Sequence, residues 1–506
     1  MATPDISPEA ALHLSPPANH EPAHRDAATT TSKDTMPHDD APIPRGRIRR
    51  AMPLAGFTAR AAGGRLIAGL REKTGVDGAV EGFHERTAER YTELLGHSKG
   101  VLMKAGQILS MVDARAVGTG GYGPYQKALA RLQADAPPMH PLLVRRVLEE
   151  ELGSAVRHFA EFCDEPMAAA SVGQVHRAVL SDRREVVVKI QYPGVAQAIR
   201  DDLANTELLA TFLRFATAAA GIKVDIRALA REAATRISEE VDYRHEAAMI
   251  TAFSDLYRDH PFIRIPHVIP EVSSDRVLTM TYLDGMAWAA AQQADQDLKN
   301  TWAEVIARFL NGNYRHANLV HADPHPGNYQ FNTDGSVGFL DFGCVQTFPE
   351  KQRQLWVAAI RATIEDRKDD FRDLMTRLRF LTADSQLSAE DLQRWITDTA
   401  PENGSEPRPV TFTPDATART ISGMFDVRDS NHPGAQITLP PQFVFTNRIQ
   451  LAWTSVAVGL QATLPLRAII DDMDGVAEPI TELGKLHHGW VRKRGLPGAL
   501  DHHDHP

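Results

Sequence analysis

Side chains able to hold a metal ion or move a proton are concentrated in the stretch HADPHPGNYQF, residues 321–331. His321, Asp323 and His325 alternate along it, and Asn328 follows three residues later. Three converging nitrogen, sulfur or oxygen ligands would form a transition-metal site. An aspartate and an asparagine offer instead the oxygen ligands that Mg²⁺ takes in octahedral geometry. The residue types alone admit both kinds of site.

The composition excludes several classes of protein. The chain has 506 residues, too many for one simple core, so we expect about three domains or lobes. The formal net charge of -10 argues against a nucleic-acid binder, which usually carries a basic surplus. The two cysteines, Cys163 and Cys344, have no C-x-x-C spacing. We therefore expect neither a disulfide scaffold nor a cysteine zinc site, and a reducing compartment fits.

The N-terminal part of the chain predicts little packed structure. Residues 1–44 are rich in Pro, Ala, His, Asp and Thr and are expected to form a disordered tail. A basic, partly amphipathic linker follows over residues 45–80. Its stretch 45–73 would lie on an anionic membrane surface or act as a solvated linker. From residue 81 to residue 154 the apolar spacing is helical.

No segment of the sequence predicts a membrane span or a signal peptide. The N-terminus lacks a basic region followed by an apolar core. Residues 449–466 carry no charge but contain five Gln, Thr and Ser residues, so we expect a buried helix there. The expected location is the cytoplasm, with peripheral contact to the inner face of a membrane.

A charged residue also stands inside a predicted hairpin. The runs AAASVGQVHRAVL and REVVVKIQYPG are rich in strand-forming residues and are separated by the polar turn SDRR. Lys189 lies in the second run among valines and isoleucine, where an edge-strand lysine that discourages aggregation is the alternative to a functional one. An acidic helix, the strand RVLTMTYLDG and a helical half holding D-x-x-x-x-N and D-F-G follow. These are the parts of a kinase.

The chain resembles the UbiB/AarF/ADCK family of atypical kinases, and four motifs carry the resemblance. KAGQ (104–107) is similar to the family's K-x-G-Q, and AAASVGQVH (168–176) to its alanine-rich nucleotide loop. EEVDYRHEA (239–247) resembles its E-x-D-Y-x-x-E-A motif. HADPHPGN and LDFG resemble its catalytic and metal motifs.

The resemblance implies an α+β, bilobal protein-kinase-like fold. It places a small β-rich N-lobe over residues 155–285 and a large helical C-lobe over residues 286–485. A helical extension carrying K-x-G-Q would occupy residues 81–154, and residues 486–506 would form a polar tail.

The resemblance also implies catalytic and metal-binding roles. Asp323 is placed like the catalytic-loop aspartate that orients or deprotonates the attacking hydroxyl. Asn328 and Asp341 would hold Mg²⁺ on the nucleotide phosphates. His321 would then brace the loop rather than bind a metal.

Nucleotide binding would use the N-lobe. Lys189 is expected on the α- and β-phosphates, paired with Glu246, because an unpaired charge in a partly dry cleft is costly. Alanines stand where protein kinases have glycines, and alanine does not adopt positive φ cheaply, so a stiffer loop and altered nucleotide handling are implied. The full set of expected nucleotide contacts is Ala168, Ala169, Ala170, Ser171, Val172, Gly173, Gln174, Lys189, Met280 and Tyr282.

Four residues are expected to regulate the site. In the family the K-x-G-Q helix folds over the cleft, so Lys104 would reach Glu240 or Asp242, and Gln107 would lie near the γ-phosphate. No A-P-E motif follows the D-F-G segment, which leaves no ordinary activation segment. Thr281 stands where many family members carry Glu, which puts the hinge chemistry in doubt.

The function implied by the resemblance is that of an ATP-binding atypical kinase or ATPase. It would use ATP or ADP with Mg²⁺ and support isoprenoid-quinone or other lipid metabolism. Its expected partners are the nucleotide, a lipid or quinone-precursor molecule and a membrane surface, but no nucleic acid. The alternatives are a small-molecule phosphotransferase of the aminoglycoside or choline kinase type, and a nucleotide-gated module without catalysis. KAGQ and EEVDYRHEA favour the first function.

Overall fold

The computed structural model describes residues 138–169, 172–203, 234, 238–239, 241–399, 408–415, 433–438, 440, 443–499 and 501. Several expectations lie outside these ranges: the tail, the basic linker and most of the helical extension, with Lys104 and Gln107, and also Ala170, Ser171 and Glu240.

The described chain begins with β-rich structure and continues as mainly helical structure. Its strands are β1 (Phe159–Phe162), β2 (Ala168–Ala169), β3 (Gly173–Leu180), β4 (Glu185–Gln191), β5 (Ile263–Arg264), β6 (Val277–Thr281), β7 (Val320–His321), β8 (Tyr329–Phe331), β9 (Val337–Phe339), β10 (Val345–Gln346), β11 (Val410–Thr411) and β12 (Thr463–Leu464). Its α-helices are α5 (Pro141–Leu152), α6 (Val195–Leu203), α9 (Tyr243–Leu256), α10 (Trp288–Ala291), α11 (Gln296–His316), α12 (Glu350–Ile364), α13 (Lys368–Arg377), α14 (Ala389–Thr399), α16 (Pro433–Gln436), α17 (Val444–Gly459), α18 (Leu466–Met473) and α19 (Glu482–Arg494).

The N-lobe is built on an antiparallel sheet with the strand order β1-β3-β4-β6, and β2 pairs with β3. The hairpin predicted around SDRR is confirmed, since β3 ends at Leu180 and β4 begins at Glu185. Register places Val175, Lys189 and Leu278 in one row across three strands. Because paired residues share a face of a sheet and neighbours along a strand alternate, Lys189 faces one side and Gln174 the other.

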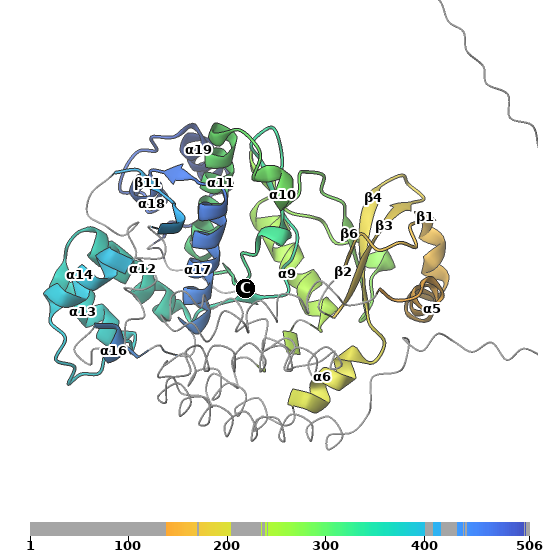
Figure 1. Cartoon of the computed structure of the whole chain (residues 1–506), viewed down its shortest axis with the longest axis horizontal. Helices are drawn as coiled ribbons and strands as arrows, with labels where there is room; N and C mark the ends of the chain where they lie inside the picture. Colours follow the sequence, from red (N-terminus) through yellow and green to blue (C-terminus); the bar gives the residue numbers. More distant parts are fainter. Residues whose placement is uncertain are drawn as a thin grey trace, which may run out of the picture. The chain divides into compact units, whose positions relative to one another are not determined.

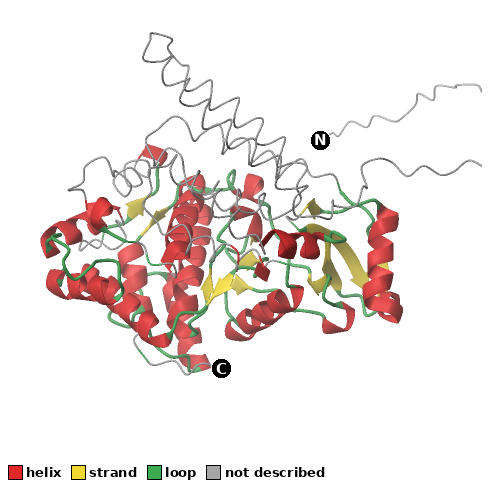
Figure 2. Ribbon diagram, turned by 90° about the horizontal axis from the view of Figure 1, so that it is seen from below, coloured by secondary structure: helices red, strands yellow, loops and turns green. Residues whose placement is uncertain are grey.

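Helix α5 covers the face of the sheet opposite to Lys189. It begins with Pro141 after the N-cap His140 and ends at Gly153, which has a positive φ of 53°. Both features match the signals that start and stop a helix. Its buried residues are Val144, Val147 and Leu148. The sheet and this helix lie together at one end of the view in Figure 2.

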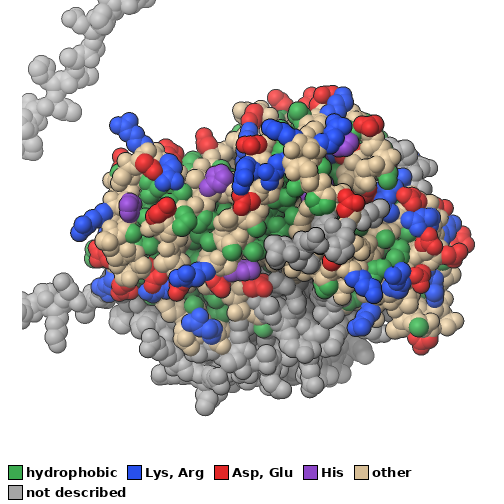
Figure 3. All heavy atoms as spheres, turned by 180° about the vertical axis from the view of Figure 1, so that it is seen from behind, with side chains coloured by type: hydrophobic (Ala, Val, Ile, Leu, Met, Phe, Trp, Pro, Cys, Tyr) green, Lys and Arg blue, Asp and Glu red, His purple; other side chains and the backbone are tan. Residues whose placement is uncertain are grey.

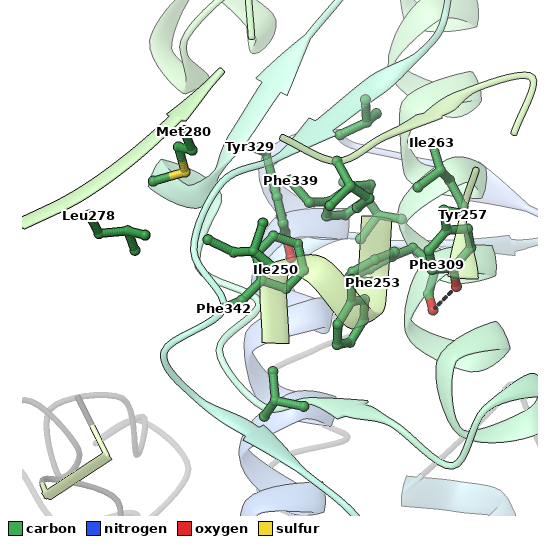
Figure 4. Close-up of a cluster of buried hydrophobic side chains, with 14 of the residues drawn as sticks. Ile250, Phe253, Tyr257, Ile263, Leu278, Met280, Phe309, Tyr329, Phe339 and Phe342 are labelled. Carbon is green, nitrogen blue, oxygen red and sulfur yellow. Dashed lines mark hydrogen bonds between the residues drawn. The ribbon is translucent and has the colours of Figure 1, made fainter. Parts of the chain in front are cut away.

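Helix α9 connects the sheet with the helical C-lobe. Figure 1 shows α9 beside β6, with α11 on its far side. Phe253 of α9 packs against Phe342 with ring centroids 4.8 Å apart and against Phe309 of α11 at 5.7 Å. These side chains belong to the continuous apolar cluster of Figure 4. The position of α9 is therefore fixed by the cores of both lobes.

Short strand pairs in the C-lobe hold the polar motifs. Strand β7 pairs antiparallel with β10, so His321 lies opposite Val345. Strands β5, β9 and β8 form a second small sheet that carries the chain between Asn328 and Asp341. On the face of the molecule drawn in Figure 3, acidic and basic side chains are interspersed.

Two sequence-based boundaries are wrong. The expected tail from residue 486 is instead part of α19, which runs to Arg494 and buries His487 and Trp490. The helix expected over residues 449–466 ends at Gly459, because Gln461 takes a positive φ of 53° and the chain turns into β12. None of the described helices combines the length and apolar character that crossing a bilayer requires.

Candidate functional site

A buried ion-pair cluster links β4, α9 and the D-F-G segment. Lys189 Nζ donates to Glu246 Oε1 at 2.6 Å and to Asp341 Oδ2 at 3.3 Å. The side chains of Lys189 and Glu246 are only 11% and 3% exposed. The pairing of Lys189 with Glu246 expected from the sequence is therefore present, and Lys189 is not a solvated edge-strand lysine.

The cluster has two carboxylates for one ammonium group, which sets its electrostatics. Burial alone would lower the pKa of Lys189, but Asp341 and Glu246 outweigh burial and raise it, so the lysine is charged. Burial raises the pKa of Glu246 to about 7, with Asp341 adding to the rise and Lys189 opposing it. An additional cation beside Asp341 would therefore relieve an excess of negative charge.

The catalytic loop is held in place by its own polar groups. Asn328 Nδ2 donates to the backbone oxygen of Asp323 at 3.2 Å and to its Oδ2 at 3.3 Å. The backbone of Asn328 accepts a bond from Leu340 N at 3.0 Å, one residue before Asp341. Hydrogen bonds therefore connect the loop that carries Asp323 and Asn328 with the segment that carries Asp341.

The two histidines of this stretch stabilise loops. His321 Nε2 donates to the backbone oxygen of Asp341 at 2.7 Å, which is the bracing contact expected for it. His325 Nδ1 accepts from Gly327 N at 3.1 Å. Within the described ranges, no three His, Cys, Asp or Glu side chains are placed to hold a metal ion. The geometry of the described residues therefore gives no support to a transition-metal site at residues 321–325.

The donor set that remains fits Mg²⁺. Asp341 and Asn328 offer oxygens, and the amide nitrogen of Asn328 is already directed at Asp323. Mg²⁺ usually takes only one or two carboxylates from a protein and completes its octahedron with phosphate oxygens and water. A site of this kind does not require a third protein carboxylate.

The loop expected over the phosphates connects β2 with β3, which pair with each other in an antiparallel hairpin. Ala168 and Ala169 are exposed, and Ala169 pairs with Gln174. The backbone oxygen of Val172 accepts a bond from Tyr192 N at 2.9 Å. A Cβ on Gly173 would lie 2.2 Å from the backbone oxygen of Ile190, so only glycine fits there.

Not every expected nucleotide contact faces the cleft. Gln174 is fully buried on the side opposite to Lys189, because it is paired with Ile190 rather than with Lys189. Its side chain therefore does not face the cleft, so only the backbone of Gln174 is placed for the expected nucleotide contact. Met280 pairs with Val187, two residues before Lys189, and so faces the cleft.

The hinge region uses some of its polar groups internally. The backbone N–H of Tyr282 donates to the oxygen of Glu185 at 3.0 Å, and its ring lies 4.5 Å from the Arg177 guanidinium. Thr281, the departure from the family pattern, accepts a bond from His267 N at 2.9 Å through Oγ1. The Thr281 hydroxyl therefore links the end of β6 to the backbone of His267.

One of the four expected regulatory residues is described. Asp242 is the N-cap of α9, and its side chain accepts from His245 N at 3.0 Å. This capping contact fixes the start of the helix that carries Glu246. The expected contact of Lys104 with Asp242 or Glu240 and the place of Gln107 lie outside the described residues.

Sequence reasoning missed two residues of the site. Gln191 Nε2 donates to the backbone oxygen of Val241 at 2.8 Å and so ties the Lys189 strand to the start of α9. The ring of Tyr243 lies 5.6 Å from Lys189 Nζ. The i, i+2 spacing of Gln191 from Lys189 and the i, i+3 spacing of Tyr243 from Glu246 were the available signals.

Comparisons with known proteins agree with this geometry. Residues 131–374 match the family model described as the ABC1 atypical kinase-like domain. Atypical kinase COQ8, mitochondrial, of Saccharomyces cerevisiae is 33% identical over 60% of this chain and 59% of its own length. Atypical kinase COQ8B, mitochondrial, of Rattus norvegicus is 28% identical over 83% of this chain and 76% of its own. The chain thus spans less than two thirds of the yeast relative.

A solved structure shares the fold. The structure titled "The complex structure of Rv3197-erythromycin from Mycobacterium tuberculosis" aligns with a TM-score of 0.56 and 28% identity. The alignment covers 81% of this chain and 99% of that chain. Together with the family match, it confirms the expected α+β, bilobal kinase-like fold.

Proposed function

Because the chain belongs to the UbiB/AarF/ADCK family of atypical kinases, we propose that it binds ATP or ADP with Mg²⁺ and catalyses phosphoryl transfer or ATP hydrolysis. The observation that supports this function best is the buried contact of Lys189 with both Glu246 and Asp341. A lysine with a carboxylate partner on a helix and a D-F-G aspartate beside it is the phosphate-binding arrangement of kinases.

Each residue has a separate task in this proposal. Lys189 binds the phosphates, and Glu246 keeps its ammonium group in place in the low-dielectric interior. Asp323 orients the attacking hydroxyl and accepts its proton. Asn328 fixes the Asp323 carboxylate by donating a hydrogen bond to it. Asn328 and Asp341 would hold Mg²⁺, which neutralises the charge on the phosphates when it is bound.

The acceptor is proposed to be a small lipid-like molecule or water. The chain after Gly343 passes directly into β10 at Val345 and into α12 at Glu350, so no long activation segment separates the D-F-G motif from the helical C-lobe. In protein kinases that segment forms part of the substrate platform. The names of the mitochondrial relatives describe atypical kinases. A role in isoprenoid-quinone or other lipid metabolism is proposed from the resemblance of the motifs to the UbiB/AarF/ADCK family, and a peripheral place on a membrane from the basic stretch 45–73.

A nucleotide-hydrolysis assay tests the function. The full-length chain is expected to hydrolyse ATP with Mg²⁺, and quinone-precursor lipids or anionic vesicles are expected to change the rate. In a parallel binding titration, Asp341→Asn should abolish the Mg²⁺-dependent tightening of nucleotide, because it removes a charged oxygen ligand. Stoichiometric zinc in the purified protein, with no Mg²⁺ effect on nucleotide affinity, would contradict the proposal.

A further inference from the structure

Two polar side chains, Gln174 and His176, are fully buried on the back face of the N-lobe sheet. His176 Nδ1 lies 2.8 Å from the backbone oxygen of Cys163, which can only accept, so this nitrogen carries the proton. His176 Nε2 is then an acceptor, and Gln174 Nε2 donates to it at 2.7 Å. The amide oxygen of Gln174 accepts from Met139 N at 2.7 Å. The hydrogen bonds form one directed chain from Met139 to Cys163.

This chain of hydrogen bonds fixes the orientation of each member. The neutral tautomer of His176 forces Gln174 to present its NH₂ group to the ring, and therefore its oxygen to Met139. The ring of Phe162 stacks on His176 with centroids 5.1 Å apart and holds the plane of the imidazole. Burial lowers the pKa of His176, which favours the neutral form that the bonding requires.

The chain of bonds passes through Gln174, at the base of the alanine loop. Gln174 directly follows Gly173, whose backbone packs on Ile190, and it pairs with Ala169 on the other side of the loop. Met139 precedes His140, the N-cap of α5. Gln174 therefore ties the base of the loop to the entrance of α5, on the face that a nucleotide beside Lys189 would not touch.

We propose that Gln174 and His176 are positioning residues that hold the base of the alanine loop against α5 and so aim the loop backbone at the phosphates of a bound nucleotide. The inference rests on the proposed nucleotide binding. It adds that side chains on the face of the sheet opposite to Lys189 determine where the loop contacts the phosphates. It accounts for two polar side chains that lie on the same face of the sheet as the buried Val186, Val188 and Ile190. A stiff loop with few glycines depends on its attachment, because it has little freedom to adjust to the ligand.

The test separates phosphate positioning from general stability. Adenosine, Mg·ADP and Mg·ATP are titrated into the full-length wild type and into Gln174→Met and His176→Phe. Gln174→Met keeps the approximate volume and removes both hydrogen bonds of the amide. His176→Phe keeps a ring for stacking on Phe162 and leaves the bond to Met139 possible. Ile190→Val is the matched control, since it trims the buried residue paired with Gln174 without touching the hydrogen bonds.

We expect Gln174→Met to weaken Mg·ADP and Mg·ATP about five- to tenfold, the equivalent of one net hydrogen bond, and adenosine less than about twofold. His176→Phe should show the same selectivity with a smaller loss, and Ile190→Val should leave the ratio of adenosine to ADP affinity unchanged. Equal weakening of all three ligands, no weakening, or failure of both variants to fold would overturn the inference. A wild type that binds none of the nucleotides would instead contradict the proposed function.

Discussion

Glu246→Gln is expected to remove a pH dependence of stability that arises in the ion-pair cluster. Glu246 and Asp341 share the ammonium of Lys189, and both carboxylates contact the same nitrogen. Burial and Asp341 raise the pKa of Glu246 from its ordinary 4.5 to about 7 in the folded chain. Glutamine keeps the shape and the capacity to accept a bond from Lys189 but does not titrate.

The sign and size of the effect follow from proton linkage. Glu246 binds its proton more tightly in the folded state, so its contribution to the free energy of unfolding is greatest below pH 4.5 and falls as pH rises to about 7. The difference between the two pKa values corresponds to about 3 kcal/mol over that window. The wild type should therefore lose up to about 3 kcal/mol from this group between those limits, whereas Glu246→Gln should not.

Urea unfolding of the full-length chain at several pH values measures the effect. The difference in the pH slope between wild type and Glu246→Gln reports the titration of this carboxyl together with its coupling to Lys189 and Asp341. Glu161→Gln, which changes an exposed carboxylate of the same lobe, is the control and should leave the slope as in wild type. An identical slope in wild type and Glu246→Gln, or a wild type that gains this contribution with rising pH, would refute the reasoning.

Three further predictions concern the loop and the N-terminal segment. Gly173→Ala should destabilise the chain by about 2 kcal/mol or more in chemical denaturation, since its Cβ would lie 2.2 Å from a backbone oxygen of β4; unchanged stability would contradict the close approach. Ala169→Gly should change the ratio of ADP to ATP affinity in a binding titration without unfolding the chain, and identical ratios in both proteins would count against a stiff loop. Deletion of residues 1–75 should abolish salt-sensitive co-sedimentation with anionic vesicles, because each basic residue near the surface adds about 1 kcal/mol; full binding without the segment would disprove this role.

The sequence predicted those parts of the site whose chemistry depends on local spacing. Asp323 and Asn328 are five residues apart in one loop, and the structure joins them by a hydrogen bond. Because side chains alternate between the two faces of a strand, the sequence placed Lys189 on the other face of β4 from Val188 and Ile190. The hairpin turn predicted that β3 pairs with β4. The partner of Lys189 on α9 came from the resemblance, since no local pattern joins residues 57 positions apart.

Long-range and terminal features could not be predicted in the same way. Gln174 belongs to the motif that resembles a nucleotide loop, yet the pairing of β3 with β4 turns its side chain to the back of the sheet. Residues 486–494 appear polar along the chain, with two histidines and three basic residues, but His487 and Trp490 are buried in the C-lobe. A short amphipathic helix at the end of a polar sequence depends on the surface that receives it, and the sequence alone does not show that surface.

The contacts around α9 bear on which part of the site can change its position. The helix is capped by Asp242, tied to β4 through Val241 and Gln191, joined to Lys189 through Glu246, and packed on Phe342 through Phe253. Moving α9 would break the last three of these contacts, all of them buried, so displacing this helix would be costly. Ala168 and Ala169 at the start of the alanine loop are instead exposed. Regulation of nucleotide binding is therefore expected to act through the loop and its support on α5, with α9 remaining in place.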